Sequence, residues 1–259
     1  MREDNVVAKV IGKPIVKLID VEIGYKNGET LVKIPDLEIF PGEIVAIAGP
    51  SGVGKTTLLR TIAGLVRSIS GTVEVCGRVV PHRPKRGKLG YIPQKLGLVR
   101  HASVMHNVML GANAGQKKEI IHRNKYIQMF SNSVLSLFPS TKAKRKSRDA
   151  IEKMRLTDKI GEPIRRLSGG QQRRVATART LAQEPALILA DEFLSELDDE
   201  TMETVLRGVV TYVKNNNAAL LVVEHDVSRA KSMADRLLVI DDGRINPFIT
   251  EVTMIEVKV

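Results

Sequence analysis

The hydrophobic positions in the N-terminal part of the chain predict three strands. Residues 15–25 and 31–40 are rich in β-branched residues and alternate between apolar and polar positions, and Lys26-Asn27-Gly28 between them has the composition of a turn. Residues 44–48 instead form a short, continuous apolar run, which is the pattern of a strand buried on both faces of a parallel sheet. We therefore expect an antiparallel pair of strands followed by the start of a parallel sheet.

Later hydrophobic runs extend this alternation of strands and helices. A helical pattern covers residues 56–65, and buried runs recur at residues 186–190, 220–223 and 237–240. Strands that alternate with helical stretches indicate an α/β fold whose sheet is mostly parallel. The two strands before residue 44 add an N-terminal antiparallel β-subdomain to this fold.

Between roughly residues 95 and 165 the pattern becomes helical, and no clear strand-like run interrupts it. The helices that we expect there cover residues 104–110, 120–137 and 150–160. We interpret this region as an α-helical subdomain that is inserted into the α/β core.

Composition adds a strong positive charge to this picture. The 259 residues carry a net charge of +11 and have an isoelectric point near 9.8, which suggests an acidic partner such as a nucleotide, nucleic acid or an anionic lipid surface. The densest basic run, residues 142–148, can be a solvated helix face or a contact with a membrane surface, and the lack of interleaved aromatic residues argues against nucleic acid. No run approaches the roughly 18 apolar residues that cross a bilayer. The single cysteine, Cys76, excludes an internal disulfide and fits a reducing cytosol.

A phosphate-binding loop follows the run at residues 44–48. Gly49-Pro50-Ser51-Gly52-Val53-Gly54-Lys55-Thr56 fits the pattern G-x-x-x-x-G-K-[ST]. Its glycines let successive backbone N–H groups point inward at phosphate oxygens, and the helix that follows directs the positive end of its dipole at the same anion. Lys55 can reach the β- and γ-phosphates of a nucleotide, and the hydroxyl of Thr56 can bind Mg²⁺. We predict that ATP and Mg²⁺ bind here.

A site for ATP and Mg²⁺ also needs acidic residues, and these follow the apolar run at residues 186–190. Asp191 comes at the end of this expected strand, where it is placed to hold Mg²⁺. Glu192 is one residue further, so its side chain points differently and can polarise the attacking water as a general base. The pair alone is also compatible with an ordinary turn at the end of a strand, and it becomes informative together with the phosphate-binding loop.

A second glycine motif, Leu167-Ser168-Gly169-Gly170-Gln171, can present a hydroxyl and backbone donors to a phosphate. A helix cap would explain Ser168 but would leave the two glycines without a reason. With this run the chain resembles the ATP-binding cassette (ABC) family, whose signature is LSGGQ. The resemblance covers about residues 13–245, which we expect to be a single P-loop NTPase domain, and leaves residues 246–259 as a C-terminal tail.

The resemblance implies further site residues. Tyr25 matches the aromatic that stacks on adenine, with an exposed tyrosine on the sheet surface as the alternative. Gln94 matches the glutamine that touches Mg²⁺ and the attacking water, and His225 matches the histidine that contacts the γ-phosphate; Ser195-Glu196-Leu197-Asp198 matches a dimer-contact loop. The complete set of expected nucleotide-binding residues is Tyr25, Gly49, Pro50, Ser51, Gly52, Gly54, Lys55, Thr56, Thr57, Ser168, Gly169, Gly170 and Gln171, with Thr56, Gln94 and Asp191 at the metal and Glu192, His225 and Gln94 in catalysis.

The sequence departs from the family's pattern at Phe193, where many members have proline. Phenylalanine frees the φ angle and restores a backbone donor, and we expect no loss of activity. The resemblance also implies that the signature completes the site of a second copy of the chain. Two chains would then pair head to tail around two ATP molecules, and hydrolysis would loosen the pair.

Two classes of function remain in view. The first is the ATPase subunit of a membrane transporter, peripheral on the cytoplasmic face of the membrane, which needs separate permease subunits and, if it imports, an extracytoplasmic binding protein. The second is a soluble ABC protein that acts on nucleic acid or ribosomes; the length of the chain and its single cassette make this less favoured. Within transporters, residues 97–108 and the Leu137-Phe138 pair resemble phosphonate importers. The transported compound and its direction stay open.

Overall fold

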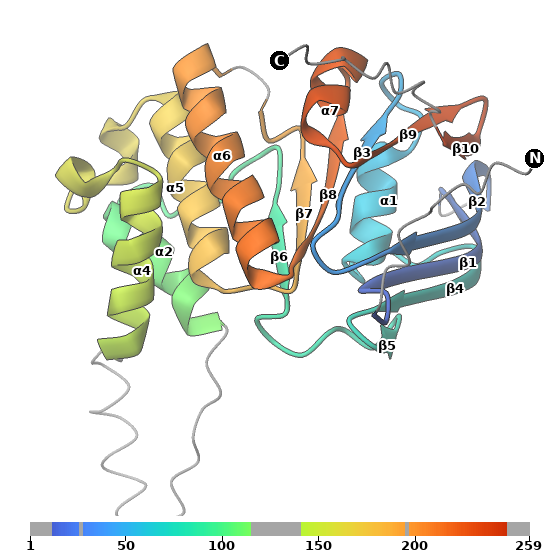
Figure 1. Ribbon diagram of the computed structural model, residues 1–259, viewed down its shortest axis with the longest axis horizontal. Helices are drawn as coiled ribbons and strands as arrows, with labels where there is room; N and C mark the ends of the chain where they lie inside the picture. Colours follow the sequence, from blue (N-terminus) through green and yellow to red (C-terminus); the bar gives the residue numbers. More distant parts are fainter. Residues whose placement is uncertain (1–11, 26–27, 115–140, 195–196, 248–259) are drawn as a thin grey trace, which may run out of the picture.

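The computed structural model describes residues 12–25, 28–114, 141–194 and 197–247 (Figure 1). Within these ranges, the strands join into one hydrogen-bonded sheet in the order β5-β4-β1-β2-β10-β9-β3-β8-β7-β6. The strands are β1 (Val16–Gly24), β2 (Thr30–Ile39), β3 (Ile44–Ala48), β4 (Ser70–Val75), β5 (Arg78–Val79), β6 (Leu89–Ile92), β7 (Leu187–Asp191), β8 (Ala219–Glu224), β9 (Arg236–Asp241) and β10 (Arg244–Pro247). The α-helices are α1 (Lys55–Ile62), α2 (Val104–Ala114), α4 (Thr141–Lys153), α5 (Gly169–Ala182), α6 (Asp199–Asn216) and α7 (Val227–Met233), with short 3₁₀ turns at Thr157–Lys159 and Ile164–Arg166.

The sheet has a parallel and an antiparallel part, as the hydrophobic pattern predicts. Strands β9, β3, β8, β7 and β6 run parallel to one another, whereas β1 pairs antiparallel with both β2 and β4. The short strand β10 connects the two parts, because it is antiparallel to β9 and forms one parallel bridge to β2. The expected α/β fold with an N-terminal antiparallel subdomain is confirmed.

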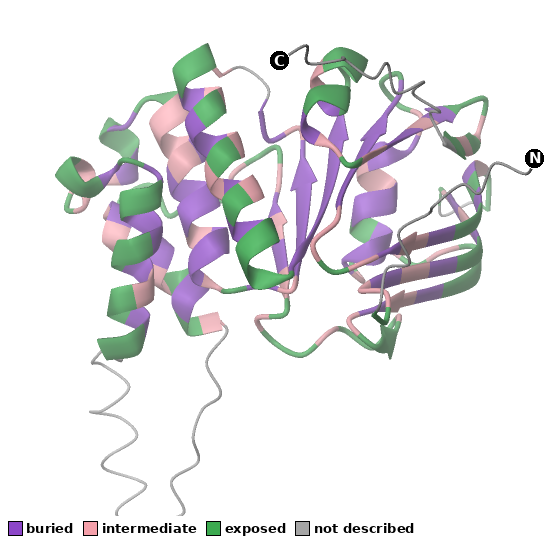
Figure 2. Cartoon of the chain, viewed as in Figure 1, coloured by how far each residue is buried: buried purple, intermediate pink, exposed green. Residues whose placement is uncertain are grey.

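Side chains of β3 alternate between two hydrophobic cores, one on each face of the parallel strands. Ile44, Ala46 and Ala48 belong to the core that also contains buried residues of α5 and α6. Val45 and Ile47 belong to the core formed with α1 and the antiparallel strands. Figure 2 shows these central strands as the most continuously buried part of the chain. The continuous apolar run thus has its physical cause: both faces of β3 are covered.

The helical subdomain packs on one side of this core, where α2 and α4 both contact α5 (Figure 1). The expected helix at residues 104–110 is α2. The helix expected at residues 150–160 is wrong in its bounds, because α4 begins at Thr141 and ends at Lys153, and Arg155 has a left-handed φ of 53° that no α-helix continues through. The basic run lies on α4, and four of its members are exposed, which is compatible with a solvated helix face and with a membrane contact alike: Lys142, Lys144, Arg145 and Arg148.

Four strands are missing from the expectations: β4, β5, β6 and β10. The last of them crosses the expected domain boundary at residue 245, since it ends at Pro247. Several expected features lie outside the described residues, namely the helix at residues 120–137, Leu137-Phe138, Lys26-Asn27, Ser195-Glu196 and residues 248–259 of the C-terminal tail. No helix of the described ranges is both long and apolar enough to cross a bilayer.

Candidate active site

The phosphate-binding loop connects the C-terminal end of β3 to the start of α1, and two of its glycines are required by the backbone. Gly49 has a φ of 152°, and a Cβ atom there would lie 2.6 Å from the backbone oxygen of Ile240. Gly54 caps α1 with a φ of 107°, in the left-handed region that favours glycine. The loop therefore curls tightly and delivers the N-terminus of α1, with its unpaired N–H groups, to one point.

Lys55 lies inside this curl. Its side chain is buried, with 5% relative exposure, and its Nζ donates hydrogen bonds of 2.6 and 2.7 Å to the backbone oxygens of Gly49 and Pro50. Burial lowers the pKa of Lys55, and nearby carboxylates oppose that shift. The ammonium group is thus held at the mouth of the loop, where two of its three N–H donors bond the backbone of the loop.

Thr56 and Asp191 meet as the sequence predicts, although 135 positions separate them. The hydroxyl of Thr56 donates to Oδ1 of Asp191 over 3.0 Å, and the hydroxyl of Tyr91 donates to Oδ2 over 3.2 Å. Burial raises the pKa of Asp191, and the hydrogen bonds from Thr56 and Tyr91 act against that increase. A hydroxyl and a carboxylate oxygen therefore lie side by side at the ends of β7 and α1.

Glu192 lies at the centre of the remaining expected catalytic groups. Oε2 of Glu192 accepts a hydrogen bond of 2.8 Å from Nε2 of Gln94, and Oε1 contacts Nε2 of His225. Because that nitrogen faces a carboxylate, we assign the imidazole proton to it, which leaves Nδ1 as an acceptor for Nζ of Lys55 at 3.4 Å. The hydroxyl of Ser51 is 3.5 Å from the same nitrogen. Gln94 and His225, from two separate segments, therefore contact the Glu192 carboxylate directly, and the phosphate-binding loop contacts His225.

The backbone of Glu192 explains why its side chain points away from that of Asp191. Glu192 has a φ of 47°, in the left-handed region that a residue with a side chain rarely occupies. Its N–H donates to the backbone oxygen of Val223 over 3.0 Å, so the turn is fixed to the end of β8. Conformational strain at such a position is a common feature of functional sites.

The signature motif begins α5, and Ser168 is its N-cap. The backbone N–H of Gln171 donates to Oγ of Ser168 over 3.2 Å, and the N–H of Ser168 donates to Oε1 of Gln171 over 3.0 Å, which is a complete capping box. The two glycines are accessible, and a Cβ atom on Gly170 would lie 3.3 Å from the side chain of Thr201. The signature thus lies against the start of α6, next to the core that contains α5 and α6. The phosphate-binding loop instead leads into α1, which packs in the core on the other face of the sheet.

The remaining expected residues lie at the rim of this arrangement. Tyr25 directly follows β1 and is 54% exposed, and Ile23 near the same strand end would be 3.7 Å from a Cβ atom on Gly54. Thr57 occupies the first turn of α1. Asp198 caps α6 by accepting a hydrogen bond of 2.9 Å from the N–H of Thr201. The structure therefore brings the end of β1 next to the phosphate-binding loop.

Two arginines of α5 contribute contacts that the motifs did not indicate. Arg173 donates to the backbone oxygens of Pro93 and Gln94 over 3.5 and 3.4 Å. Arg179 donates to the backbone oxygens of Leu96 and Gly97 over 2.8 Å each. The loop that carries Gln94 is therefore held by the same helix that begins with the signature. The only sign of this in the sequence is that this helix carries three arginines, Arg173, Arg174 and Arg179, among mostly small and apolar residues.

A phosphate-binding loop, an acidic strand end and a polarising glutamate define a P-loop nucleotide hydrolase. Residues 32–195 match the ABC transporter family. The L-cystine transport system ATP-binding protein TcyN of Escherichia coli is 35% identical over 230 residues, which cover 85% of this chain and 84% of TcyN. The phosphonates import ATP-binding protein PhnC of Hyphomonas neptunium is 36% identical over 241 residues, which cover 89% of this chain and 85% of PhnC.

A solved ATP-binding cassette has the same fold as this chain. A dimeric ATP-binding cassette in a post-hydrolysis state, bound to ADP and Pi, has a TM-score of 0.72 at 27% identity, and the match covers 91% of this chain and 99% of that chain. The chain belongs to the ABC transporter family. It is an ATP-binding and ATP-hydrolysing subunit of such a transporter.

Proposed function

We propose that ATP is hydrolysed at the convergence of Gln94, Glu192 and His225, with its phosphates on the loop around Lys55. The observation that carries this proposal is the double contact of the Glu192 carboxylate, which accepts from Gln94 at 2.8 Å and contacts the His225 imidazole. A carboxylate whose two oxygens are oriented by separate side chains is prepared to take a proton from a bound water. Tyr25 would supply the aromatic face for adenine, since it is exposed next to the loop.

The residues present fit Mg²⁺. Thr56 and Asp191 offer a hydroxyl and a carboxylate oxygen that already lie 3.0 Å apart, and oxygen ligands are those that this ion prefers. Among the described residues, no three His, Cys, Asp or Glu side chains gather into a metal cage. A Mg²⁺ ion that also binds substrate phosphates needs only one or two protein ligands, so Thr56, Asp191 and Gln94 would suffice to hold it. When bound, the ion neutralises charge on the β- and γ-phosphates.

The protein side chains then divide the work. Lys55 would hold the β- and γ-phosphates, since its ammonium group is fixed at the mouth of the loop. Glu192 would accept the proton of the attacking water, and Gln94 would orient that water through its amide. His225 would donate from Nε2 to a γ-phosphate oxygen after leaving the Glu192 carboxylate. The contacts of Gln94 with Glu192, of Glu192 with His225 and of His225 with Lys55 support this division of roles.

We further propose that Ser168, Gly169 and Gly170 close the site of a second copy of the chain. The exposed hydroxyl and the N-terminal N–H groups of α5 are suited to a phosphate, and a dimeric relative of this fold has been solved with ADP and Pi. Such a pair would bind separate transmembrane permease subunits from the cytoplasmic side of the membrane. In an import system, an extracytoplasmic binding protein would deliver the substrate to the permease.

For the substrate we propose an alkylphosphonate. PhnC proteins of several organisms match this chain at 32–36% identity, and the segment at residues 97–108 resembles that group. In the structure this segment is organised by Asn107, which is fully buried and bonds the backbone of Val99 in both directions, at 2.8 and 3.2 Å. L-Cystine is the second candidate, because TcyN is as similar as the PhnC relatives.

An uptake experiment distinguishes these substrates. A host strain that lacks this chain is supplied with labelled methylphosphonate or labelled L-cystine and complemented with the wild type or with Lys55→Ala. We expect that methylphosphonate uptake is lost in the deletion strain and restored by the wild type alone. Unchanged methylphosphonate uptake, or a loss confined to L-cystine, would contradict the phosphonate proposal. Co-purification of the chain with ribosomes or DNA instead of a permease would contradict the transporter role.

A further inference from the structure

Glu224 is a buried acid that none of the family's motifs explains. It is the last residue of β8, it has 2% relative exposure, and it directly precedes His225. Within the described residues, its Oε1 atom has no hydrogen-bond partner. Burial raises the pKa of Glu224 to about 7, against the opposing charges of Arg229 and Arg173. Burying a carboxyl group without full hydrogen bonding costs free energy of folding, so a buried carboxyl group next to the hydrolysis site indicates a role there.

The Glu224 carboxyl group also contacts the segment that carries Glu192. The backbone N–H of Leu194 donates a hydrogen bond to the Glu224 carboxylate. On the other side, Nη1 of Arg229 donates to the backbone oxygen of Leu194 over 3.4 Å. Together with the bond from the N–H of Glu192 to the backbone oxygen of Val223 at 3.0 Å, these contacts fix residues 192–194 to the end of β8 and the start of α7.

We propose that Glu224 is a positioning residue for ATP hydrolysis, whose carboxyl group keeps Glu192 aimed at Gln94 and His225. This inference rests on the proposed role of Glu192 as the general base. Glu192 has the unfavourable φ of 47°, and a residue in that conformation persists only where its surroundings hold it. Without the bond to Leu194, the turn can relax to an ordinary φ, and the carboxylate of Glu192 rotates away from its two partners.

A second connection from Glu224 leads to the Gln94 loop. Arg173 of α5 is buried, with 7% relative exposure, and its charge lowers the pKa of Glu224. The same guanidinium donates to the backbone oxygen of Gln94 over 3.4 Å. Glu224 thus lies beside the turn after β7 and the start of α7, and Arg173 connects it to the loop after β6. All three contribute to the surroundings of the Glu192 carboxylate.

The test compares Glu224→Ala with Glu224→Gln in ATP turnover and in ATP affinity. Glutamine keeps an acceptor oxygen for the N–H of Leu194, and the raised pKa indicates that the site accommodates a neutral side chain. We expect Glu224→Ala to lower kcat about 10- to 100-fold, because a misplaced general base has effects of that order. Glu224→Gln should restore kcat to near the wild-type value, and both variants should keep the wild-type Kd for ATP. Tyr212→Phe, which removes a buried hydrogen bond of 2.8 Å to Pro185, is the control for lost stability and should keep kcat.

Arg229→Gln keeps the inference testable if Glu224→Ala does not fold. This partly exposed residue bonds the same segment at Leu194, so we expect a fall in kcat of about 2- to 10-fold at unchanged ATP affinity, as for the loss of one hydrogen bond. Wild-type kcat in Glu224→Ala, or in Arg229→Gln where the former is unfolded, would overturn the proposal. Equal losses in the alanine and glutamine variants, or a parallel loss of ATP affinity, would also overturn it. The ATP turnover of Glu192→Gln is measured alongside. If Glu192→Gln retains turnover, the proposed function fails. If Glu192→Gln loses turnover while Glu224→Ala keeps the wild-type kcat, only the positioning role is rejected.

Discussion

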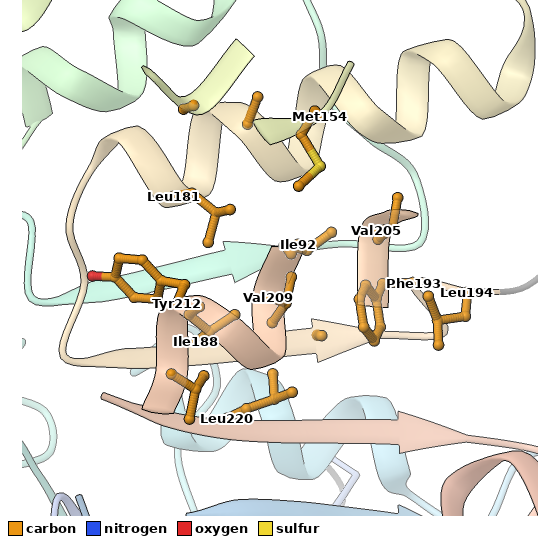
Figure 3. Packing of buried hydrophobic residues seen from close by; sticks show 14 of the residues in the cluster. Ile92, Met154, Leu181, Ile188, Phe193, Leu194, Val205, Val209, Tyr212 and Leu220 are labelled. Atoms are coloured by element: carbon orange, nitrogen blue, oxygen red, sulfur yellow. The ribbon is translucent and has the colours of Figure 1, made fainter. Parts of the chain in front are cut away.

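Replacing Phe193 by alanine tests how the core supports the catalytic turn. Phe193 follows Glu192, and its side chain is fully buried in the core that includes Val205 and Val209 of α6. Figure 3 shows its ring among the labelled residues of this cluster. The departure from the family's proline therefore has a structural role beyond the backbone, because the ring connects the turn to α6.

The size of the effect follows from the burial of the ring. Removing a fully buried phenylalanine side chain loses its transfer free energy and leaves a cavity, which together cost about 3–5 kcal/mol. For a domain of this size, 1 kcal/mol corresponds to a change in Tm of about 2–4 °C. We therefore expect Tm to fall by about 6–20 °C. We also expect a lower kcat below the transition temperature, since collapse around the cavity moves Glu192.

Thermal unfolding followed by circular dichroism measures this loss, and ATP turnover is measured well below the transition. Leu65→Ala is the matched control, because Leu65 is 54% exposed and its truncation should change stability by about 0.5 kcal/mol or less. A fall in Tm for Phe193→Ala that is no larger than that of the control would refute the packing of Phe193 in the core. Unchanged turnover together with a large fall in Tm would refute the link between the ring and the catalytic turn.

Three further predictions address other parts of the site. Lys55→Ala removes the charge-assisted bonds to phosphate, so calorimetric titration with ATP should show an affinity lower by about 100-fold, and wild-type affinity would reject the phosphate site. Ser168→Arg places a long side chain at the exposed signature, so the variant should bind ATP yet stay at 28.5 kDa in light scattering; an ATP-dependent dimer would remove the signature from the interface. The pKa of Glu224 is about 7 in the folded protein and 4.5 in the unfolded chain. The free energy of unfolding of the wild type therefore falls by about 3 kcal/mol as the pH rises between these two values. Glu224→Gln lacks that loss, and its urea unfolding free energy relative to the wild type should increase by that amount from pH 4.5 to 8; a constant difference would contradict the raised pKa.

The sequence predicts best where a pattern has one physical cause. The run at residues 44–48 could be identified as a strand because β3 is covered on both faces, which leaves no polar position in it. β6 escaped prediction since it has only four residues, one of which is Gly90. A Cβ atom at Gly90 would lie 2.6 Å from the side chain of Thr180, so the glycine is required by tertiary packing that local periodicity does not reveal.

In the active site, too, local features could be predicted from the sequence, whereas contacts between distant segments could not. Lys55, Asp191 and Glu192 could be assigned because their chemistry and the strands before them are local in the sequence. The positioning groups could not, because Glu224, Arg173 and the N–H of Leu194 come from three separate segments and meet only in the fold. The one local sign for Glu224 is a charged residue at the end of an apolar strand.

Turnover and mass of Glu192→Gln test the central claim most directly. If Glu192 is the general base of a site that two copies share, the variant should bind ATP as the wild type does and lose about 10²- to 10⁴-fold in kcat. In light scattering with ATP it should then double its mass from 28.5 kDa, because the shared nucleotides are no longer hydrolysed. Unchanged turnover would show that another group takes the proton from water, and a monomer with bound ATP would contradict the shared site.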